Sequence, residues 1–169
     1  MSEKWGESLE KVKFKSSAEL INHFNIIWDK FPMSPWDSDN PDKIVIKKIK
    51  LLKNIINNLS EDSYILDLGC GGGEFIAMVL NYFQNFKKIN LNLVGVDIAD
   101  KAILKAQKKG IYKELINCRI NQTEKFCKYK FSLILINEVL YYENDYIDTL
   151  KKILDTCQTQ YIYICCNGL

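Results

Sequence analysis

The stretch YILDLGCGGGE, residues 64–74, decides the fold of this 169-residue chain. It opens with five mostly apolar residues, as buried parallel strands do, and continues into a run of glycines. Gly69, Gly71 and Gly73 carry no Cβ atom, so a ligand can approach the backbone closely and positive φ angles are accessible. A helical pattern follows from Glu74. The stretch therefore predicts a strand, a tight glycine loop and a helix, which is the setting of a nucleotide site.

Strand and helix patterns alternate along the rest of the chain. We expect further strands at residues 92–96, 115–120, 131–136 and 161–165, and helices at 74–86, 100–109 and 144–157. The last helix is expected to bury Ile147, Leu150, Ile153 and Leu154. Parallel strands need crossover connections, and these place helices on both faces of the sheet. The sequence predicts a doubly wound, mostly parallel α/β domain.

Two helices are expected before the first strand. The first opens with a capping box, Ser16 to Glu19, and its predicted apolar face comprises Leu20, Phe24, Ile27, Trp28 and Phe31. The second follows Asn40-Pro41, runs to about residue 58 and carries Lys43, Lys47 and Lys50 on one side. A solvated helix face explains this lysine stripe better than a nucleic-acid patch does. We divide the chain into a loose arm (1–15), a helical lid (16–60) and a core (61–169).

The composition is that of a soluble globular protein, with 47% hydrophobic and 26% charged residues. A net charge of +2 gives no electrostatic reason to expect nucleic acid or an anionic membrane as a partner. No apolar stretch approaches the ~20 residues of a spanning helix, and the charged start does not resemble a signal peptide. The six cysteines show no zinc-ligand spacing, so we expect no metal and reduced, scattered thiols in a cytoplasmic protein.

A second acidic position follows the next expected strand, where LVGVD ends at Asp97. In a parallel sheet of this kind, the end of that strand lies beside the glycine loop, and a carboxylate there can accept both hydroxyls of a ribose. The alternative role, capping the following helix, suits Asp100 better. Dinucleotide folds share both features, but here Asp67 and Glu74 flank the loop and would repel a pyrophosphate. A cationic amino acid with a sulfonium suits two carboxylates better than NAD does.

These motifs resemble those of class I S-adenosylmethionine (SAM)-dependent methyltransferases. Residues 67–74 look like their motif I, and Val96-Asp97 resembles their second motif. Residues 131–142, FSLILINEVLYY, resemble their fourth-strand motif and are closest to the nodulation protein S type of small-molecule N-methyltransferases. The resemblance covers roughly residues 30–168. It implies a Rossmann-like sheet in the order 3-2-1-4-5.

The resemblance also implies a role for each matching residue. Asp67 and Gly69 would hold the methionine amino end of SAM, Gly71 would pass under the ribose, and Cys70, between them in the loop, would also bind the cofactor. Asp97 would bind the ribose hydroxyls and Ile98 would pack on adenine. Relatives have an acid that bonds the adenine amine where this chain has Asn121, whose carbonyl can still accept that bond. Asn137 would present its backbone beside the methionine portion.

The implied reaction is in-line transfer of a methyl group to a small-molecule nitrogen or oxygen, with S-adenosylhomocysteine (SAH) as product. Positioning and exclusion of water are the main tasks of the protein, and a base is needed only for a protonated acceptor. Glu138, Tyr141 and Tyr142 are the candidate catalytic residues, with packing as the alternative for the tyrosines. Trp36 is a candidate lid residue. The Asn/Asp-Pro-Pro-Tyr/Phe motif of enzymes that methylate nucleic-acid bases is absent.

Relatives continue past the fifth strand with a final hairpin, whereas this sequence ends at Leu169. The fifth strand is therefore expected to form an open, apolar sheet edge, which natural proteins avoid. We expect a homo-oligomer, a partner chain that covers this edge, or a sequence that is part of a longer protein. A competing interpretation of the function follows: a catalytically silent SAM-binding subunit that scaffolds or activates a partner.

Overall fold

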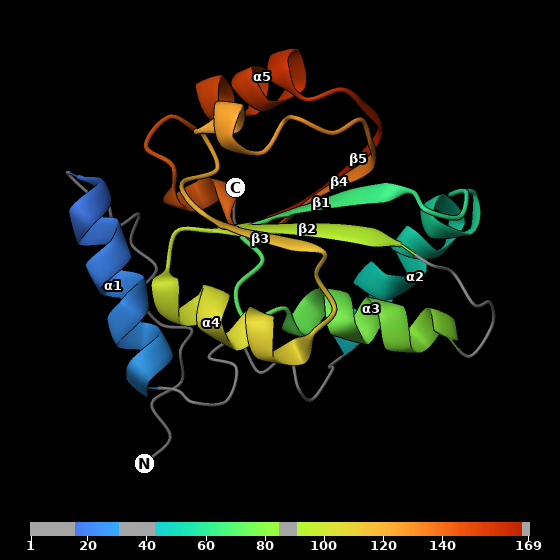
Figure 1. The fold of residues 1–169 in the computed structure, drawn as a ribbon, viewed down its shortest axis with the longest axis horizontal. Helices are drawn as coiled ribbons and strands as arrows, with labels where there is room; N and C mark the ends of the chain where they lie inside the picture. Colours follow the sequence, from blue (N-terminus) through green and yellow to red (C-terminus); the bar gives the residue numbers. More distant parts are fainter. Residues whose placement is uncertain (1–15, 31–42, 85–90, 167–169) are drawn as a thin grey trace.

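A single parallel sheet organises the structure, a computed structural model that describes residues 16–30, 43–84 and 91–166. Its strands are β1 (Tyr64–Leu68), β2 (Asn92–Asp97), β3 (Glu114–Asn117), β4 (Phe131–Asn137) and β5 (Thr159–Cys165). They lie in the order β3-β2-β1-β4-β5, and every pairing is parallel (Figure 1). The doubly wound α/β fold and its strand order are confirmed.

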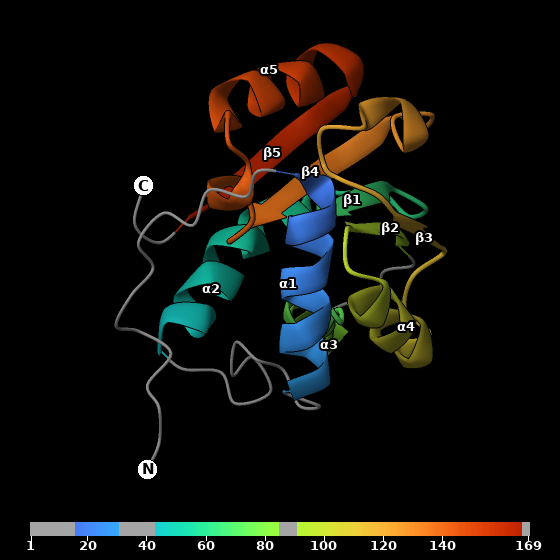
Figure 2. The ribbon, with the colours of Figure 1, turned by 90° about the vertical axis from the view of Figure 1, so that its left-hand side faces the viewer.

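Helices cover both faces of this sheet. Figure 1 shows α2 (Lys43–Asn57), α3 (Glu74–Gln84) and α4 (Asp100–Lys109) on one face and α5 (Tyr146–Thr156) on the other. Helix α1 (Ser17–Lys30) lies beyond the carboxyl ends of the strands, where Figure 2 shows it in front of the sheet. Short 3₁₀ turns, η1 (Thr123–Lys125) and η2 (Leu140–Tyr142), flank β4. The carboxyl edge of the sheet is thus the place where α1, the glycine loop and η2 meet.

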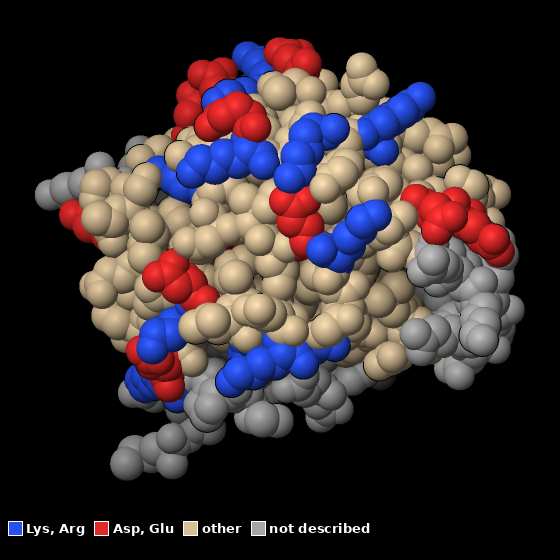
Figure 3. Space-filling view, in the orientation of Figure 1, with Lys and Arg blue, Asp and Glu red and all other residues tan. Residues whose placement is uncertain are grey.

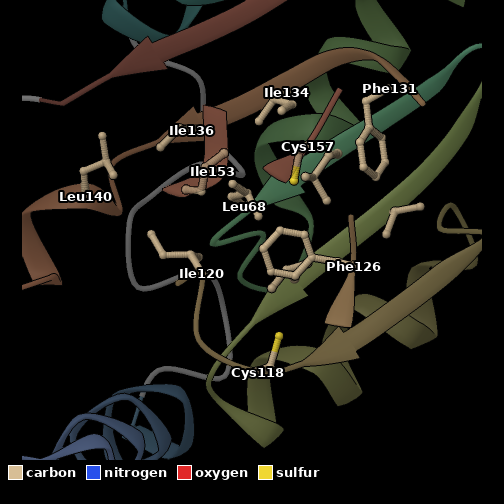
Figure 4. Close-up of a cluster of buried hydrophobic side chains, with 13 residues drawn as sticks. Leu68, Cys118, Ile120, Phe126, Phe131, Ile134, Ile136, Leu140, Ile153 and Cys157 are labelled. Carbon is tan, nitrogen blue, oxygen red and sulfur yellow. The ribbon is translucent and has the colours of Figure 1, made fainter. Parts of the chain in front are cut away.

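The sheet separates two hydrophobic cores because alternate side chains of each strand face opposite layers. Leu66 and Leu68 of β1 join the α5 core, while Ile65 joins the core beneath α2 and α3. Figure 4 shows the α5 core, in which the fully buried rings of Phe126 and Phe131 are the largest side chains. A parallel sheet covered by helices on both faces is expected to have central strands that are apolar on both faces, as these strands are.

The two helices before β1 form largely as the sequence predicts. The Glu19 N–H donates to Ser16 Oγ (3.2 Å), one half of the predicted capping box. The predicted inward residues of α1 are buried against Ala99 and Ala102: Leu20, Phe24, Ile27 and Trp28. In α2, Ile49, Leu52 and Ile56 pack into the same core as the sheet. Phe31, Trp36 and the arm of residues 1–15 lie outside the described residues, and the division at residue 60 stays a prediction.

Three local predictions are wrong. Ile147 and Leu154 of α5 are 52% and 48% exposed, because this helix turns Thr149 and Ile153 toward the sheet. The third strand ends at Asn117 rather than 120, where the Cys118 N–H turns back to the Asp97 carbonyl (3.0 Å). Helix α4 is preceded by Ala99, so Asp100 is its first residue and not its cap.

The cysteines also differ from the prediction of scattered thiols. Cys127, in the turn before β4, and Cys157, at the end of α5, form a disulfide with a Cα–Cα distance of 4.9 Å. This spacing falls within the usual range for a disulfide. The other cysteines in the described residues, Cys70, Cys118, Cys165 and Cys166, are free. The expectation failed because nothing in the sequence spacing places residues 127 and 157 side by side.

Charge is dispersed on the surface. Figure 3 shows Lys and Arg side chains interspersed with Asp and Glu on the face it presents. Lys47 and Lys50 of the predicted stripe are exposed on α2, as a solvated helix face requires. Among the helices described, none combines the length and the apolar character needed to cross a membrane.

Replacing Gly95 by alanine should destabilise the protein. A Cβ at this position would meet Leu115 Cδ2 and Tyr112 Cε1, both at 2.8 Å, in the middle of the sheet. We expect the free energy of unfolding to fall by about 1–3 kcal/mol, the usual cost of overpacking. Chemical denaturation is the measurement. Gly110→Ala is the comparison, since its Cβ would enter open space and only its positive φ would add cost. Equal stability of Gly95→Ala and the wild type would contradict this packing.

Candidate functional site

The glycine loop between β1 and α3 is held against the end of β2. The N–H groups of Gly69 and Cys70 both donate to the Val96 carbonyl, at 2.8 and 3.0 Å. Gly69, Gly71 and Gly73 have φ angles of 70°, 55° and 81°, a left-handed conformation that side chains other than glycine seldom adopt. A Cβ on Gly69 would also lie 2.5 Å from the Val139 side chain. The loop is therefore fixed in a conformation that requires glycine, as the sequence predicts, whereas close approach of a ligand to it stays a prediction.

Asp97, at the end of β2, is joined directly to this loop. Its Oδ2 accepts from the Gly71 N–H and its Oδ1 from the Ala99 N–H, both at 2.9 Å. Burial raises the pKa of Asp97, and these backbone donors oppose the rise. Each carboxylate oxygen can accept more than one hydrogen bond, so both remain able to bind ribose hydroxyls. The predicted pairing of Asp97 with the glycine loop is present.

Asp67 lies at the end of β1 beneath the loop and is 5% exposed. Tyr112, from the connection between α4 and β3, donates its hydroxyl to Asp67 Oδ2 at 2.7 Å. Burial raises the pKa of Asp67 from 3.8 to about 7; the Tyr112 hydrogen bond lowers it and the charge of Asp97 raises it. Sequence reasoning missed Tyr112, which is outside the motif. The glycine at position 95, beside Asp67 in the sheet, was the signal that a ring would fill this space.

Glu74, the first residue of α3, is buried and is not an isolated negative charge. Lys105 Nζ and Lys109 Nζ of α4 lie 3.9 and 3.6 Å from its Oε1. Lys105 Nζ also lies 4.8 Å from the centre of the Trp28 ring, which stands against Gly71. Glu74 therefore repels an anion at the loop less strongly than the sequence suggests. Among the described residues, the acidic groups of the site that no lysine offsets are Asp67 and Asp97.

The carboxyl end of β4 presents Asn137 and Glu138. Glu138 adopts a φ of 57°, a strained conformation that often marks functional sites, and its N–H donates to the Cys165 carbonyl (2.7 Å). Lys48 of α2, only 8% exposed, forms an ion pair with Glu138 Oε1 (2.6 Å) and donates to Asn137 Oδ1 (3.3 Å). Sequence reasoning missed Lys48, which was not part of the predicted stripe of Lys43, Lys47 and Lys50 and was given no role.

Tyr141 and Tyr142 are half-buried and packed together, with ring centroids 4.2 Å apart. Tyr142 also meets Phe24 of α1 edge-on at 4.7 Å. Burial raises the pKa of Tyr141 far above its usual value, so its hydroxyl stays protonated near neutral pH. Both rings have a packing role, and a catalytic role for either one stays a prediction.

Asn121 and Ile98 lie in different surroundings. Ile98 packs beside α1, and the side chain of Asn117 donates to the carbonyls of Asp97 (3.1 Å) and Ile98 (3.0 Å). Asn121 instead donates to Glu143 Oε2 (3.4 Å), which pairs with Arg119 at 2.9 Å beside an open hollow of about 440 Å³. Asn117, the last residue of β3, is thus a further polar residue that contacts the turn after β2, one that the motif comparison did not suggest.

Two remaining predictions concern Trp36 and metals. Trp36 lies outside the described residues. Within residues 16–30, 43–84 and 91–166, no group of three or more histidine, cysteine, aspartate or glutamate side chains is arranged to hold a metal ion.

Comparison with known proteins identifies the family. Residues 66–159, more than half of the chain, match the family described as methyltransferase domain, and the chain belongs to that family. No significant match was found among curated proteins.

Solved structures share the fold at low sequence identity. The plantazolicin methyltransferase BamL, in complex with a triazolic desmethylPZN analog and SAH, is 21% identical with a TM-score of 0.58; the match covers 88% of this chain and 56% of that one. The N-methyltransferase NodS from Bradyrhizobium japonicum WM9, in complex with SAH, is 21% identical with a TM-score of 0.56, over 73% of this chain and 61% of that one. The CurJ carbon methyltransferase is 18% identical with a TM-score of 0.60, over 78% and 39%. The chain thus spans less than two thirds of each of these proteins.

The raised pKa of Asp67 should make stability depend on pH. Because its folded pKa of about 7 lies above its usual 3.8, Asp67 stabilises the fold fully below about pH 4 and loses that contribution as the pH rises to about 7. We expect the free energy of unfolding to fall across this window by at most about 1.4 kcal/mol per pH unit. Asp97, shifted in the same direction, adds to the trend.

Denaturation at several pH values measures this dependence. Asp67→Asn should flatten it, whereas Asp155→Asn, at an exposed position on α5, should leave it unchanged. A slope that is identical in Asp67→Asn and the wild type would contradict the assignment.

Proposed function

We propose that this chain binds SAM and transfers its methyl group to a nitrogen or oxygen of a small molecule, releasing SAH. The observation that carries the proposal is the joined set of Asp67, the glycine loop and Asp97, with Gly71 N–H donating to the Asp97 carboxylate. Membership of the methyltransferase domain family and the SAH bound to BamL and NodS support it.

The residues present fit this cofactor chemically. Asp97 offers carboxylate oxygens for the two ribose hydroxyls. The side chains of Val139 and Trp28 lie against Gly69 and Gly71, so a ligand at the loop would also contact these two side chains. Asp67 offers a buried negative charge for the amino group of the methionine portion. Ile98 offers an apolar surface for adenine, and Asn121 keeps its proposed contact with the adenine amine only if its side chain turns from Glu143.

When bound, SAM supplies a methyl group already activated by its positive sulfur. The chain's own residues would orient the two reactants and exclude water. Asn137 is the last residue of β4 and Glu138 follows it. The next residue, Val139, packs on the glycine loop. Glu138 is paired with Lys48, so it would act on an acceptor proton only together with that lysine. Tyr141 and Tyr142 remain proposed substrate contacts.

The first prediction of this proposal concerns cofactor choice. SAM and SAH should bind with micromolar dissociation constants, and NAD should not bind, because a pyrophosphate at the glycine loop would face the buried Asp67 carboxylate. Titration calorimetry with each compound is the measurement. Tight binding of NAD without binding of SAM would overturn the cofactor assignment.

A second prediction concerns Asp97. Asp97→Asn keeps an acceptor for only one of the two backbone donors, Gly71 and Ala99, and loses the charge that favours the ribose hydroxyls. Hydrogen bonds to a charged group contribute roughly 1.5–3 kcal/mol. We expect the affinity for SAH to fall at least about tenfold, which corresponds to about 1.4 kcal/mol. Asp97→Ala should lose the affinity and also some stability, since the N–H groups of Gly71 and Ala99 lose their acceptor. Unchanged SAH binding by Asp97→Asn would show that this residue serves only the turn.

The alternative function is a catalytically silent SAM-binding subunit, and we propose an oligomer or partner chain for either case. β5 pairs only with β4 among the described strands, and Ile164 on it is 42% exposed. Tyr163, on the same strand, is buried in the core. Methyl-transfer assays with and without co-purifying proteins distinguish an enzyme from a silent subunit.

The association itself is tested by sedimentation at low micromolar concentration. We expect the wild type to associate through the edge of β5 and Ile164→Lys to be monomeric, because a lysine on an edge strand opposes pairing. Ile26→Lys, at an exposed position on α1, is the control. A monomeric wild type with full methyl transfer would rule out a required partner.

A further inference from the structure

Tyr112 occupies a space that two glycines leave open. It lies between α4 and β3, outside the glycine-loop motif, and its ring is fitted over the sheet. A Cβ on Gly95 would come within 2.8 Å of Tyr112 Cε1, and one on Gly73 within 2.9 Å of Tyr112 Cε2. Gly95 is the register partner of Asp67 on the neighbouring strand. The missing side chain at position 95 therefore creates the room beside Asp67 that the tyrosine ring fills.

The hydroxyl of Tyr112 ends at the Asp67 carboxylate. The O–H donates to Asp67 Oδ2 at 2.7 Å, a charge-assisted bond at a 5% exposed residue. Burial and the neighbouring negative charges raise the pKa of Tyr112 well above its usual value, so it stays a donor at any physiological pH. The Tyr112 ring packs against Gly73 and Gly95, and this packing fixes the position of its hydroxyl relative to the Asp67 carboxylate.

Several groups around Asp67 act on its pKa in opposite directions. Asp97, from the end of β2, and the thiol of Cys70, in the loop, face the same region. Glu74 of α3 adds a third carboxylate, which Lys105 and Lys109 of α4 offset. Burial raises the pKa of Asp67 to about 7, and the Tyr112 hydrogen bond is the contribution that lowers it.

We propose that Tyr112 is a positioning residue for cofactor binding: its hydroxyl holds the Asp67 carboxylate in place to receive the amino group of the methionine portion. This inference rests on the proposed function and names a residue that the motif does not contain. Its consequence is a pH dependence. A protonated Asp67 has no charge to offer an ammonium group, so binding should weaken as the pH falls, and Tyr112 sets the pH at which this happens.

The test compares two ligands that differ in the amino-acid part. SAH carries the amino group, whereas 5′-methylthioadenosine keeps the adenine and ribose and lacks the amino acid. In the wild type, the affinity for SAH should be about tenfold weaker near pH 5.5 than near pH 7.5, following the ionisation of Asp67. The affinity for 5′-methylthioadenosine should be the same at both pH values. Calorimetry provides both measurements without a turnover assay.

Tyr112→Phe keeps the ring between the glycines and removes only the hydroxyl. We expect the midpoint of the SAH pH profile to move up by about one unit, the size of one hydrogen bond to a charged group. Binding of 5′-methylthioadenosine should not change. Tyr64→Phe is the matched control, because it removes a hydroxyl that bonds Lys113 (2.6 Å) near the amino end of β1. It should leave both profiles as they are.

Each other outcome overturns the inference in a distinct way. A wild-type SAH affinity that does not vary with pH would show that Asp67 does not receive the amino group. An equal decrease in the affinities for SAH and 5′-methylthioadenosine in Tyr112→Phe would show that Tyr112 only supports the loop. An unchanged SAH profile in Tyr112→Phe would show that its hydrogen bond is irrelevant to binding. If neither ligand binds the wild type at any pH, the proposed function itself fails, and the inference fails with it.

Discussion

The contact between the glycine loop and the end of β2 is the constraint on which the site depends. The Val96 carbonyl accepts from two consecutive loop N–H groups, and the Asp97 carboxylate accepts from Gly71. These bonds tie together two strands that are separated by a helix in the sequence. They also hold the Asp97 carboxylate at the end of β2, where its charge adds to the burial that raises the pKa of Asp67.

Local sequence features sufficed to predict the sheet, its helices and the main polar positions. The glycine loop, Asp67 and Asp97 lie within two short segments, and each segment carries its own signal of strand, turn and helix. The boundaries of β1 and the inward faces of α1 and α2 follow from hydrophobic periodicity, which depends only on neighbouring residues. The same periodicity failed for Ile147 and Leu154, because it does not say how wide a stripe of α5 the sheet can cover.

The residues that sequence reasoning missed all act across long separations. Tyr112 reaches Asp67 from 45 positions away, and Lys48 reaches Glu138 from 90. Asn117 and the Cys127–Cys157 pair likewise acquire their partners only when the chain has folded. Single side chains of these types carry no pattern of their own. Glycines are the exception, since Gly95 in mid-strand indicates that something large lies over it.

The ion pair between Lys48 and Glu138 bears on where this protein can be divided. A cut at residue 60 is attractive from the sequence, because the strand–helix alternation begins just beyond it. Such a cut would remove α2 and with it Lys48. The Glu138 carboxylate, which is 17% exposed in the intact structure, would then lose its ion pair with that lysine. The cut would also uncover the apolar residues of β1 and β4 on which α2 packs. Helix α2, which the sequence groups with the predicted lid, therefore contributes side chains to the core of the α/β sheet.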